Sequence, residues 1–300
     1  MLKIKSEFLK AGIEIKIAEP MSRHSTIKCG GNAKLYYEPK DLEQLGIGIN
    51  ILKNNNIKFM ILGNGSNTLF KDDGFNGAVI CINPSFFDVE FFDNKIYVPS
   101  GMLLKNVYNA LYERGLSGFE FAAHIPATIG GAVYINAGCF DSSFQDIVES
   151  VLTYDYKIDD CKFKNNAECG FSYRHSDFQT TKEIILGAVL KLKPDDKENI
   201  KRKADKYFAV RKNTQPINYP SLGSVFKRGK DYFPAKLIEE CKLKGLNIGG
   251  AEVSKLHSGF IVNKGCHESK NILTLIDTIK AKVYNVYKIE LIEEIEIIGD

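Results

Sequence analysis

Three short segments of the chain carry side chains of the kinds that catalyse reactions. An arginine supplies a fixed cation, a serine or lysine can pass a proton, and a protonated carboxyl can donate a hydrogen bond. Each segment alone is equally typical of ordinary surface residues, because isolated charges and Gly-Ser turns mostly face water. The segments are "CGFSYRHSDF" with Tyr173, Arg174 and His175, "YPSLGSVFKRG" with Ser224 and Lys227, and "IELIEEIEIIG" with Glu293, Glu294 and Glu296.

Two glycine-rich stretches indicate where a ligand can approach the backbone. "ILGNGSNTLFKDDGF" (61–75) follows an apolar run, and its glycines free backbone N–H groups to turn toward a phosphate. It lacks the dinucleotide fingerprint, since Thr68 replaces a third glycine, and it is not a P-loop. "FEFAAHIPATIGGAVYINAG" (119–138) carries no formal charge after Glu120. Together the stretches suggest two walls of a dinucleotide-cofactor site, with tight strand packing as the alternative for the second.

Two other kinds of site have little support. The five histidines, among them His24, His124 and His257, show no metal-ligand spacing, and the seven cysteines are scattered, so we expect reduced thiols and no metal. Ser224 lies in "LGSVF", which lacks the second glycine of a G-x-S-x-G elbow. A serine hydrolase is therefore disfavoured.

The composition is that of a globular protein with nearly balanced charge. Of 300 residues, 44% are hydrophobic and 26% charged, and 40 basic against 37 acidic residues leave a net charge of +3. We therefore expect no general nucleic-acid or membrane surface. Charges interrupt every apolar run of the N-terminal segment, so we expect no secretory signal and a cytoplasmic protein.

Hydrophobic periodicity predicts the elements that must hold these segments in place. Residues 76–100 and 146–193 contain short β-branched and aromatic runs typical of strands. A basic amphipathic helix near 201–212 connects this part to a C-terminal unit. The remaining predictions are a helix in 39–56 followed by a strand and the glycine loop, a helix in 101–116 ended by Gly115, a helix from Pro234 to Gly245, a long helix in 269–288, and a final strand in 289–299.

Taken in order, seven segments together resemble one enzyme family. They are "HSTIKCGG" (24–31), "LGNGSNTL" (62–69), "GFEFAAHIPATIGGAVYINAG" (118–138), "CGFSYRHSDF" (169–178), "PSLGSVFKR" (220–228), "AKLIEECKLKG…IGGAEVSKLHSGFIVN" (235–263) and the terminal "IELIEEIEIIG". This order is similar to that of the UDP-N-acetylenolpyruvoylglucosamine reductases, flavoenzymes of peptidoglycan precursor synthesis. The short gap after "YRHSDF" resembles the shorter subtype, which lacks an extra tyrosine-bearing loop.

The resemblance implies an α+β fold in several parts. A two-lobed FAD-binding domain of the vanillyl-alcohol-oxidase/PCMH type, with lobes at 1–78 and 79–200, precedes a smaller α+β substrate-binding domain at 201–287. A C-terminal strand at 288–300 carries Glu294. The resemblance also implies a cytoplasmic enzyme, and we expect a monomer.

The resemblance assigns most of the two glycine-rich stretches to non-covalent FAD. NADPH is the implied co-substrate, occupying the substrate pocket before the nucleotide sugar. The implied FAD contacts are Gly63, Asn64, Gly65, Ser66, Asn67, Thr68, Ile125, Pro126, Thr128, Gly130, Gly131, Ala132 and Gly138.

Three residues receive catalytic roles from the same resemblance. Arg174 and Glu294 would stabilise the enolate that forms when hydride from flavin N5 attacks the enolpyruvyl ether of UDP-N-acetylglucosamine enolpyruvate, and Ser224 would donate the proton. The implied substrate contacts are Tyr173, Lys227, Arg228 and His257; Lys227 is also a candidate to assist Ser224.

Three departures from the family pattern keep two other functions open. His124 and Ala127 replace usual glycines, and Arg228 replaces a usual asparagine that contacts the substrate. A flavin oxidase of the same fold, with a histidine linked covalently to the ring, is one rival, and a flavin- or nucleotide-sugar-binding protein without catalysis is the other. Retention of Arg174, Ser224 and Glu294 favours the reductase.

Overall fold

The computed structural model describes residues 1–299, so only Asp300, the last residue of the predicted 288–300 segment, lies outside it. The chain forms two compact units. The first unit comprises Met1–Lys16, Leu35–Asn64 and Ala78–Ala209. The second comprises Ile17–Lys34, Gly65–Gly77 and Val210–Asp300. Each unit therefore draws on segments far apart in the sequence.

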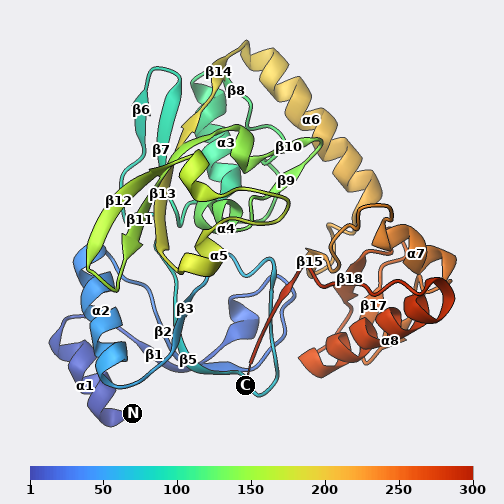
Figure 1. Cartoon of the computed structure of the whole chain (residues 1–300), viewed down its shortest axis with the longest axis horizontal. Helices are drawn as coiled ribbons and strands as arrows, with labels where there is room; N and C mark the ends of the chain where they lie inside the picture. The colour runs from blue at the N-terminus through green and yellow to red at the C-terminus, as the bar shows by residue number, and fades with distance from the viewer. Residues whose placement is uncertain (300) are drawn as a thin grey trace. The chain divides into compact units, whose positions relative to one another are not determined.

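The first unit is built around a five-stranded antiparallel sheet of order β12-β11-β13-β7-β6 (Figure 1). Its central register pairs Val151 with Ala188 and Ala188 with Val98. The predicted strand-rich middle of the chain is confirmed. The strands are β6 (Glu90–Phe92), β7 (Lys95–Pro99), β11 (Val148–Asp155), β12 (Asp160–Asn165) and β13 (Ile184–Lys191).

Two helices, α3 (Leu104–Glu113) and α4 (Ile129–Tyr134), pack against this sheet (Figure 1). Leu104, Val107 and Leu111 of α3 are fully buried, as their spacing predicts, and Gly115 follows the helix with φ +65°. Helix α4 was not predicted. It begins at Thr128, whose Oγ1 accepts the N–H of Gly131 at 3.3 Å, so a short capped helix occupies the small-residue run.

A second core of the first unit involves the N-terminal helices α1 (Leu2–Lys10) and α2 (Leu42–Asn54). The α2 helix confirms the prediction for 39–56, and Asp41 caps it by accepting the N–H of Gln44 at 2.8 Å. The adjoining sheet has the order β1-β2-β5-β3. Its strands are β1 (Lys16–Pro20), β2 (Asn32–Tyr37), β3 (Phe59–Ile61) and β5 (Phe75–Ile80).

Short elements complete the first unit and its connections. Strands β8 and β14 pair with each other, as do β9 and β10. These elements are β8 (Leu116–Ser117), β9 (Gly138–Cys139), β10 (Ser142–Ser143), β14 (Lys193–Pro194), helix α5 (Phe178–Thr181) and the 3₁₀ turns Phe144–Asp146 and Ala167–Cys169. A third 3₁₀ turn, Met21–Arg23, belongs to the second unit.

The second unit contains a four-stranded sheet of order β15-β18-β17-β16, along which the long helix α8 runs (Figure 1). Helix α8 (Ser269–Tyr287) confirms the prediction for 269–288. Strand β4 (Thr68–Phe70) pairs in parallel with the last strand, β19 (Glu296–Ile298). The other elements are β15 (Ser221–Ser224), α7 (Pro234–Glu240), β16 (Asn247–Ile248), β17 (Ala251–Val253) and β18 (Phe260–Asn263).

Two predicted boundaries are wrong. Helix α7 begins at Pro234 as expected but ends at Glu240 rather than at Gly245, because Lys242 already adopts a left-handed conformation with φ +59°. The terminal strand is also shorter than 289–299. Strand β19 starts at Glu296, and Glu294 lies just before it, next to an isolated bridge between Glu293 and Phe226.

The basic connecting helix is confirmed as α6 (Lys197–Thr214). Its buried residues are Ile200 and Ala204, whereas its charged side chains face solvent.

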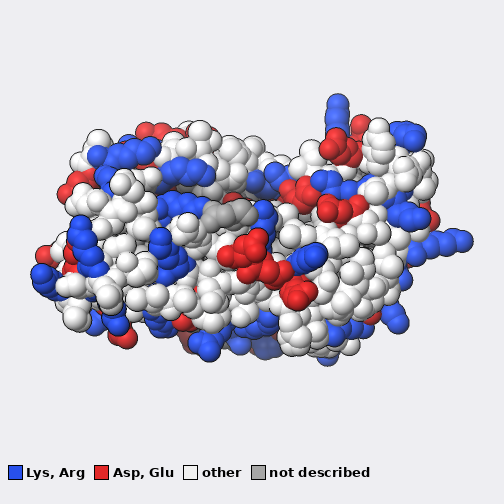
Figure 2. Space-filling model, turned by 90° about the horizontal axis from the view of Figure 1, so that it is seen from below, with Lys and Arg blue, Asp and Glu red and all other residues white. Residues whose placement is uncertain are grey.

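On the face shown in Figure 2, basic side chains are scattered and acidic ones gather in small groups between them. Within residues 1–299, none of the helices combines the length and the apolar character that crossing a bilayer requires.

Helix α8 has a distant cap, which generates a stability prediction. The Asp72 carboxylate accepts the N–H of Ser269 at 2.7 Å and that of Lys270 at 2.9 Å. Asp72→Ala leaves both donors unsatisfied, so we expect a loss of about 1–2 kcal/mol in the free energy of unfolding measured with urea.

The neighbouring Asp73→Ala is the control, because no hydrogen bond of its side chain exists among the described residues. We expect it to change the unfolding free energy by less than about 0.5 kcal/mol. Equal effects of the two substitutions would contradict the capping role of Asp72.

Candidate active site

The glycine loop presents a row of unused backbone donors. Among residues 1–299, no protein acceptor takes the N–H of any residue from Gly63 to Asn67. Gly65 adopts φ +57°, a conformation that reverses the direction of the backbone and that glycine tolerates best. Consecutive amide donors in such a turn form a concave binding site for anions. The loop therefore has the backbone donors that an anion-binding turn requires.

The first half of this loop is anchored within the first unit. Asn64 donates its side-chain amide to the carbonyl of Pro126 at 2.7 Å. A Cβ on Gly63 would lie 2.6 Å from Oγ1 of Thr128, the residue that caps α4. The structure thus brings together four predicted FAD contacts, two from each glycine-rich stretch.

The second half of the loop is anchored within the second unit by the motif "HSTIKCGG". The carbonyl of Gly65 accepts the backbone N–H of Thr26 at 3.1 Å and Oγ of Ser25 at 3.3 Å. Thr26 Oγ1 also donates to the carbonyl of Ser221 at 2.6 Å. Sequence reasoning noted this motif without giving it a role, because a side chain that holds a loop forty residues away leaves no local signal.

Most backbone N–H groups of the small-residue run (119–138) donate hydrogen bonds within the protein. Their acceptors are backbone carbonyls or the Thr128 hydroxyl, so these amides are not available to a ligand. Most of this stretch would therefore contact a ligand through its surface and not through main-chain N–H donors. The committed amides are those of Ile125, Ala127, Ile129, Gly130, Gly131 and Ala132.

Close packing explains two glycines of this run. A Cβ on Gly130 would lie 2.9 Å from Cβ of Ser100, and one on Gly138 would lie 2.5 Å from the carbonyl oxygen of Ser142. Gly131 differs. A Cβ added there would lie 3.5 Å from Thr128 Oγ1, which is an ordinary van der Waals contact. Packing thus requires Gly130 and Gly138, and a ring could lie against Gly131.

The two departures in this run are accommodated without strain. The His124 ring packs on Phe208 of α6 with centroids 4.5 Å apart. Ala127 is buried and is absent from the residues with positive φ, as its side chain requires.

Arg174 is at the tip of a tight turn in the first unit. Ser172 and His175 exchange two backbone hydrogen bonds of 3.1 and 3.2 Å across it, and Arg174 takes φ +55°. Its Nη2 donates to the carbonyl of Gly138 at 3.1 Å, and its guanidinium lies 5.2 Å from the ring centroid of the exposed Tyr173. The arginine is thereby beside the end of the small-residue run.

Ser224 and Glu294 lie on neighbouring backbone segments of the second unit. Glu294 donates its N–H to the carbonyl of Val225 at 2.7 Å, and Lys227 donates its N–H to Ile292 at 2.8 Å. Asn67 completes the arrangement, because its side-chain amide donates to the Glu294 carbonyl at 3.0 Å. The pairing brings a hydroxyl, a carboxyl and the glycine loop into one region of this unit.

The other predicted substrate contacts also belong to the second unit. The Arg228 guanidinium lies 4.7 Å from the ring centroid of Phe233. His257 Nδ1 accepts the N–H of Gly259 at 3.1 Å, and the Gly259 carbonyl accepts the N–H of Val225 at 2.9 Å. The His257 turn is therefore adjacent to the strand that carries Ser224.

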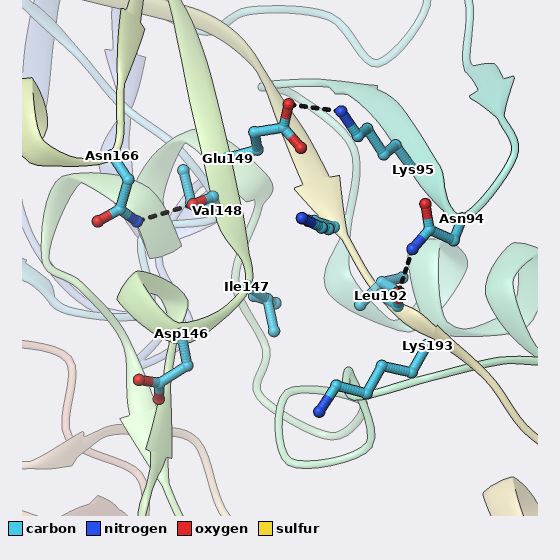
Figure 3. A pocket seen from close by; sticks show the side chains of 10 residues that line it. Asn94, Lys95, Asp146, Ile147, Val148, Glu149, Asn166, Leu192 and Lys193 are labelled. Carbon is cyan, nitrogen blue, oxygen red and sulfur yellow. Dashed lines mark hydrogen bonds and ion pairs between the residues drawn. The ribbon is translucent and has the colours of Figure 1, made fainter.

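One further pocket contains none of the predicted site residues. A cavity of about 490 Å³ opens at the ends of β7, β11 and β13 in the first unit (Figure 3). Lys95 and Glu149 form a 2.7 Å ion pair across it, and Asn94 and Asn166 donate to backbone carbonyls of Leu192 and Val148. Four of its polar side chains thus have partners within the lining.

Comparison with known proteins identifies the fold and the family. The family model of an FAD-binding domain matches residues 33–157, and that of the UDP-N-acetylenolpyruvoylglucosamine reductase C-terminal domain matches 215–298. UDP-N-acetylenolpyruvoylglucosamine reductase of Clostridioides difficile is 40% identical, covering 96% of this chain and 94% of that protein. The enzyme of that name from Anoxybacillus flavithermus is 38% identical and covers 100% and 99%.

A solved structure agrees with this result. The crystal structure of UDP-N-acetylenolpyruvylglucosamine reductase from Thermus caldophilus superposes with a TM-score of 0.82 at 31% identity, covering 96% of this chain and 99% of that one. Fold and cofactor domain define an FAD-dependent oxidoreductase of the α+β class. The chain belongs to the UDP-N-acetylenolpyruvoylglucosamine reductase family. The expected family, fold class and FAD cofactor are confirmed.

Substitution of Gly65 tests the geometry of the loop. Alanine there adopts a disfavoured φ, and its Cβ would lie 2.1 Å from the His24 carbonyl oxygen. We expect Gly65→Ala to lower the free energy of unfolding by about 1 kcal/mol for the φ and by a further 1–3 kcal/mol for the clash.

Gly12→Ala separates the two contributions. Gly12 has φ +69° but no atom within 4 Å of an added Cβ, so it reports the conformational cost alone. Chemical denaturation of both variants measures the difference. Equal losses would mean that the His24 carbonyl moves aside without cost.

His257 generates a pH prediction. Burial, as the largest cause, lowers the pKa of His257 below its usual 6.5. The unfolded chain therefore takes up a proton at a pH where the folded chain does not. The stability contributed by neutral His257 is complete above pH 6.5 and is lost as the pH falls toward the folded-state value.

His257→Asn provides the matched variant, because an asparagine oxygen can accept from Gly259 without titrating near neutral pH. We expect the unfolding free energy of wild type relative to this variant to decline between pH 7.5 and pH 5. A difference that stays constant over this range would refute the effect of burial.

Proposed function

We propose that the protein reduces UDP-N-acetylglucosamine enolpyruvate to UDP-N-acetylmuramate with NADPH, in peptidoglycan precursor synthesis. Membership of the reductase family supports the reaction. The observation that supports the residue assignment is the backbone hydrogen bond from Glu294 to Val225, since it holds the segment of Glu294 against the residue that follows Ser224. Bound FAD would supply hydride chemistry between NADPH and the enolpyruvyl methylene carbon, and the loop Gly63–Thr68 would hold it.

The protein groups would then stabilise the charge that develops on the substrate. Addition of hydride to the methylene carbon moves negative charge onto the conjugated carboxylate as an enolate. The Arg174 guanidinium offers fixed, always charged donors, and a protonated Glu294 carboxyl offers one more. Preorganised donors of this kind contribute on the order of 10²-fold or more each.

Ser224 would supply the proton that completes the reduction at the α-carbon. A hydroxyl is a weak acid at neutral pH, so it needs an adjacent cation. Lys227 supports this role because it lies three residues away on the same segment, and its backbone is fixed by Ile292. Tyr173, Arg228 and His257 would contact the nucleotide sugar.

The proposal also covers the rest of the chain. Lobes 1–78 and 79–200 would hold FAD through the loop Gly63–Thr68 and the surface around Gly131, and residues 201–287 would bind the substrate. The unused amides of the loop support its part in this assignment. We further propose a cytoplasmic monomer of the subtype without the extra tyrosine loop.

The direct test mixes purified holoenzyme, NADPH and the enolpyruvyl nucleotide sugar while NADPH absorbance is followed. We expect oxidation of NADPH that depends on the sugar, and FAD that stays in the supernatant after acid precipitation. Absence of sugar-dependent oxidation would eliminate the reductase. FAD retained in the precipitate would instead support an oxidase with a covalent link to His124.

Ser224→Ala tests the proton donor. We expect it to slow reoxidation of the reduced flavin by the nucleotide sugar about 10²–10⁴-fold, because the general acid is removed. Stopped-flow absorbance of the flavin measures this rate. Ser221→Ala, in the same strand and equally half-buried, is the control and should stay within about threefold of wild type, as substitutions that touch no reacting group do.

Two substitutions of Glu294 test whether its side chain acts as a hydrogen-bond donor. Glu294→Gln keeps an N–H donor, whereas Glu294→Ala removes it, so we expect the glutamine variant to reoxidise faster by about tenfold or more. Identical rates for the two variants would show that Glu294 does not act as a donor.

A further inference from the structure

The backbone at Arg174 is held in an unfavourable conformation. Arg174 is not a glycine, yet it has φ +55°. This left-handed conformation is unfavourable for a residue with a Cβ, so it persists only where surrounding contacts determine it. The two hydrogen bonds between Ser172 and His175 close the turn but do not fix its position on the first unit.

Asn136 supplies the first external contact of the turn. Its side-chain amide donates to the Ser172 carbonyl at 2.8 Å and to Oε1 of Gln145 at 3.1 Å, and its Oδ1 accepts the N–H of Gln145 at 2.9 Å. Asn136 is only 3% exposed. A buried amide with its donors and acceptor in use has one defined orientation.

Gln179 of α5 supplies the second external contact. Its Nε2 donates to the carbonyl of Arg174 at 3.2 Å and to that of Tyr134 at 3.0 Å. The hydroxyl of Ser176, which is completely buried, donates to the same Tyr134 carbonyl at 2.6 Å. The turn is thus attached to the end of helix α4 on both sides of Arg174.

The guanidinium end of Arg174 depends on the same segment. Its acceptor, the carbonyl of Gly138, lies two residues after Asn136. Asn136 itself has φ +46°, a left-handed conformation that asparagine tolerates better than most residues. One buried asparagine therefore determines both the backbone of the turn and the local path of the chain that receives the guanidinium.

We propose that Asn136 and Gln179 are positioning residues for Arg174, fixing its guanidinium for the charge that develops on the substrate. The inference rests on the proposed function. A fixed cation stabilises a transition state only where it already lies in place, and an error of about 1 Å can cost 10²-fold in rate. Neither residue needs to touch the substrate to act in this way.

The variants are chosen to separate side-chain contacts from backbone strain. Asn136→Gly keeps the left-handed backbone conformation accessible and removes the side-chain amide. Asn136→Asp keeps the oxygen that accepts from Gln145 and removes both N–H donors. Gln179→Leu removes the hydrogen bond to the Arg174 carbonyl. Asn94→Ala is the matched control, since Asn94 likewise donates to a backbone carbonyl in the first unit, that of Leu192 at 3.0 Å.

The kinetic readout is reoxidation of chemically reduced holoenzyme by saturating enolpyruvyl nucleotide sugar. We expect the Asn136 and Gln179 variants to reoxidise about 10- to 100-fold more slowly per bound FAD, with KM within about threefold of wild type. The control should match wild type. A slower rate only in proportion to lost FAD or lost folded protein would overturn the proposal.

Amide hydrogen exchange of the protein without substrate gives a readout that does not depend on activity. We expect faster exchange in peptides covering residues 170–180 for the Asn136 and Gln179 variants and not for the control, because the turn loses its attachment. Unchanged exchange in this segment together with unchanged reoxidation would refute the positioning role. Wild-type enzyme that is not reoxidised by the sugar would refute the proposed function instead.

Discussion

The second unit depends on the pairing of the last residues of the chain with segments far earlier in the sequence. Glu294 and Lys227 are held by backbone hydrogen bonds between 225–227 and 292–294, and β19 pairs in parallel with β4. Asn67 contributes twice, donating to the Glu294 carbonyl and accepting the N–H of Glu296. A candidate catalytic carboxyl is therefore placed by the residue that ends the glycine loop.

The small-residue run is packed closely against its neighbours. Its amides are mostly used within the protein, and Gly130 and Gly138 are required because side chains or backbone of neighbouring segments lie too close for a Cβ. The loop 63–67 has the opposite character, with amides that no described residue accepts. The two glycine-rich stretches look alike in sequence but differ in how many backbone donors remain without a protein acceptor.

Helices with a long hydrophobic repeat were predictable from the sequence. Short helices, and helix ends that depend on the conformation of one residue, were not. Helices α2, α3 and α8 follow from the spacing of apolar residues. Helix α4 was missed because it is six residues long and contains two glycines, so neither periodicity nor propensity identifies it. The end of α7 depends on a lysine that adopts a left-handed conformation, which no propensity predicts.

The same limit applies to the candidate site. Motif order identified the family, and with it the types of residue at the site. The contacts of Asn136 with Ser172 and of Thr26 with Ser221 join residues 36 and 195 positions apart, and no local pattern encodes them. Prediction from one sequence therefore names the reacting groups, while the side chains that hold them are found only in the structure.

The position of β19 limits how the chain can be extended. The carbonyl of Ile298 accepts the N–H of Lys71 at 2.7 Å, so ordered pairing continues through Ile298. Residues inserted directly after Ile298 would adjoin a strand region in which Glu296 donates its N–H to the Asn67 carbonyl. The amino end offers more freedom, because Leu2 is 87% exposed and the first helix contributes only Ile4 and Phe8 to the core.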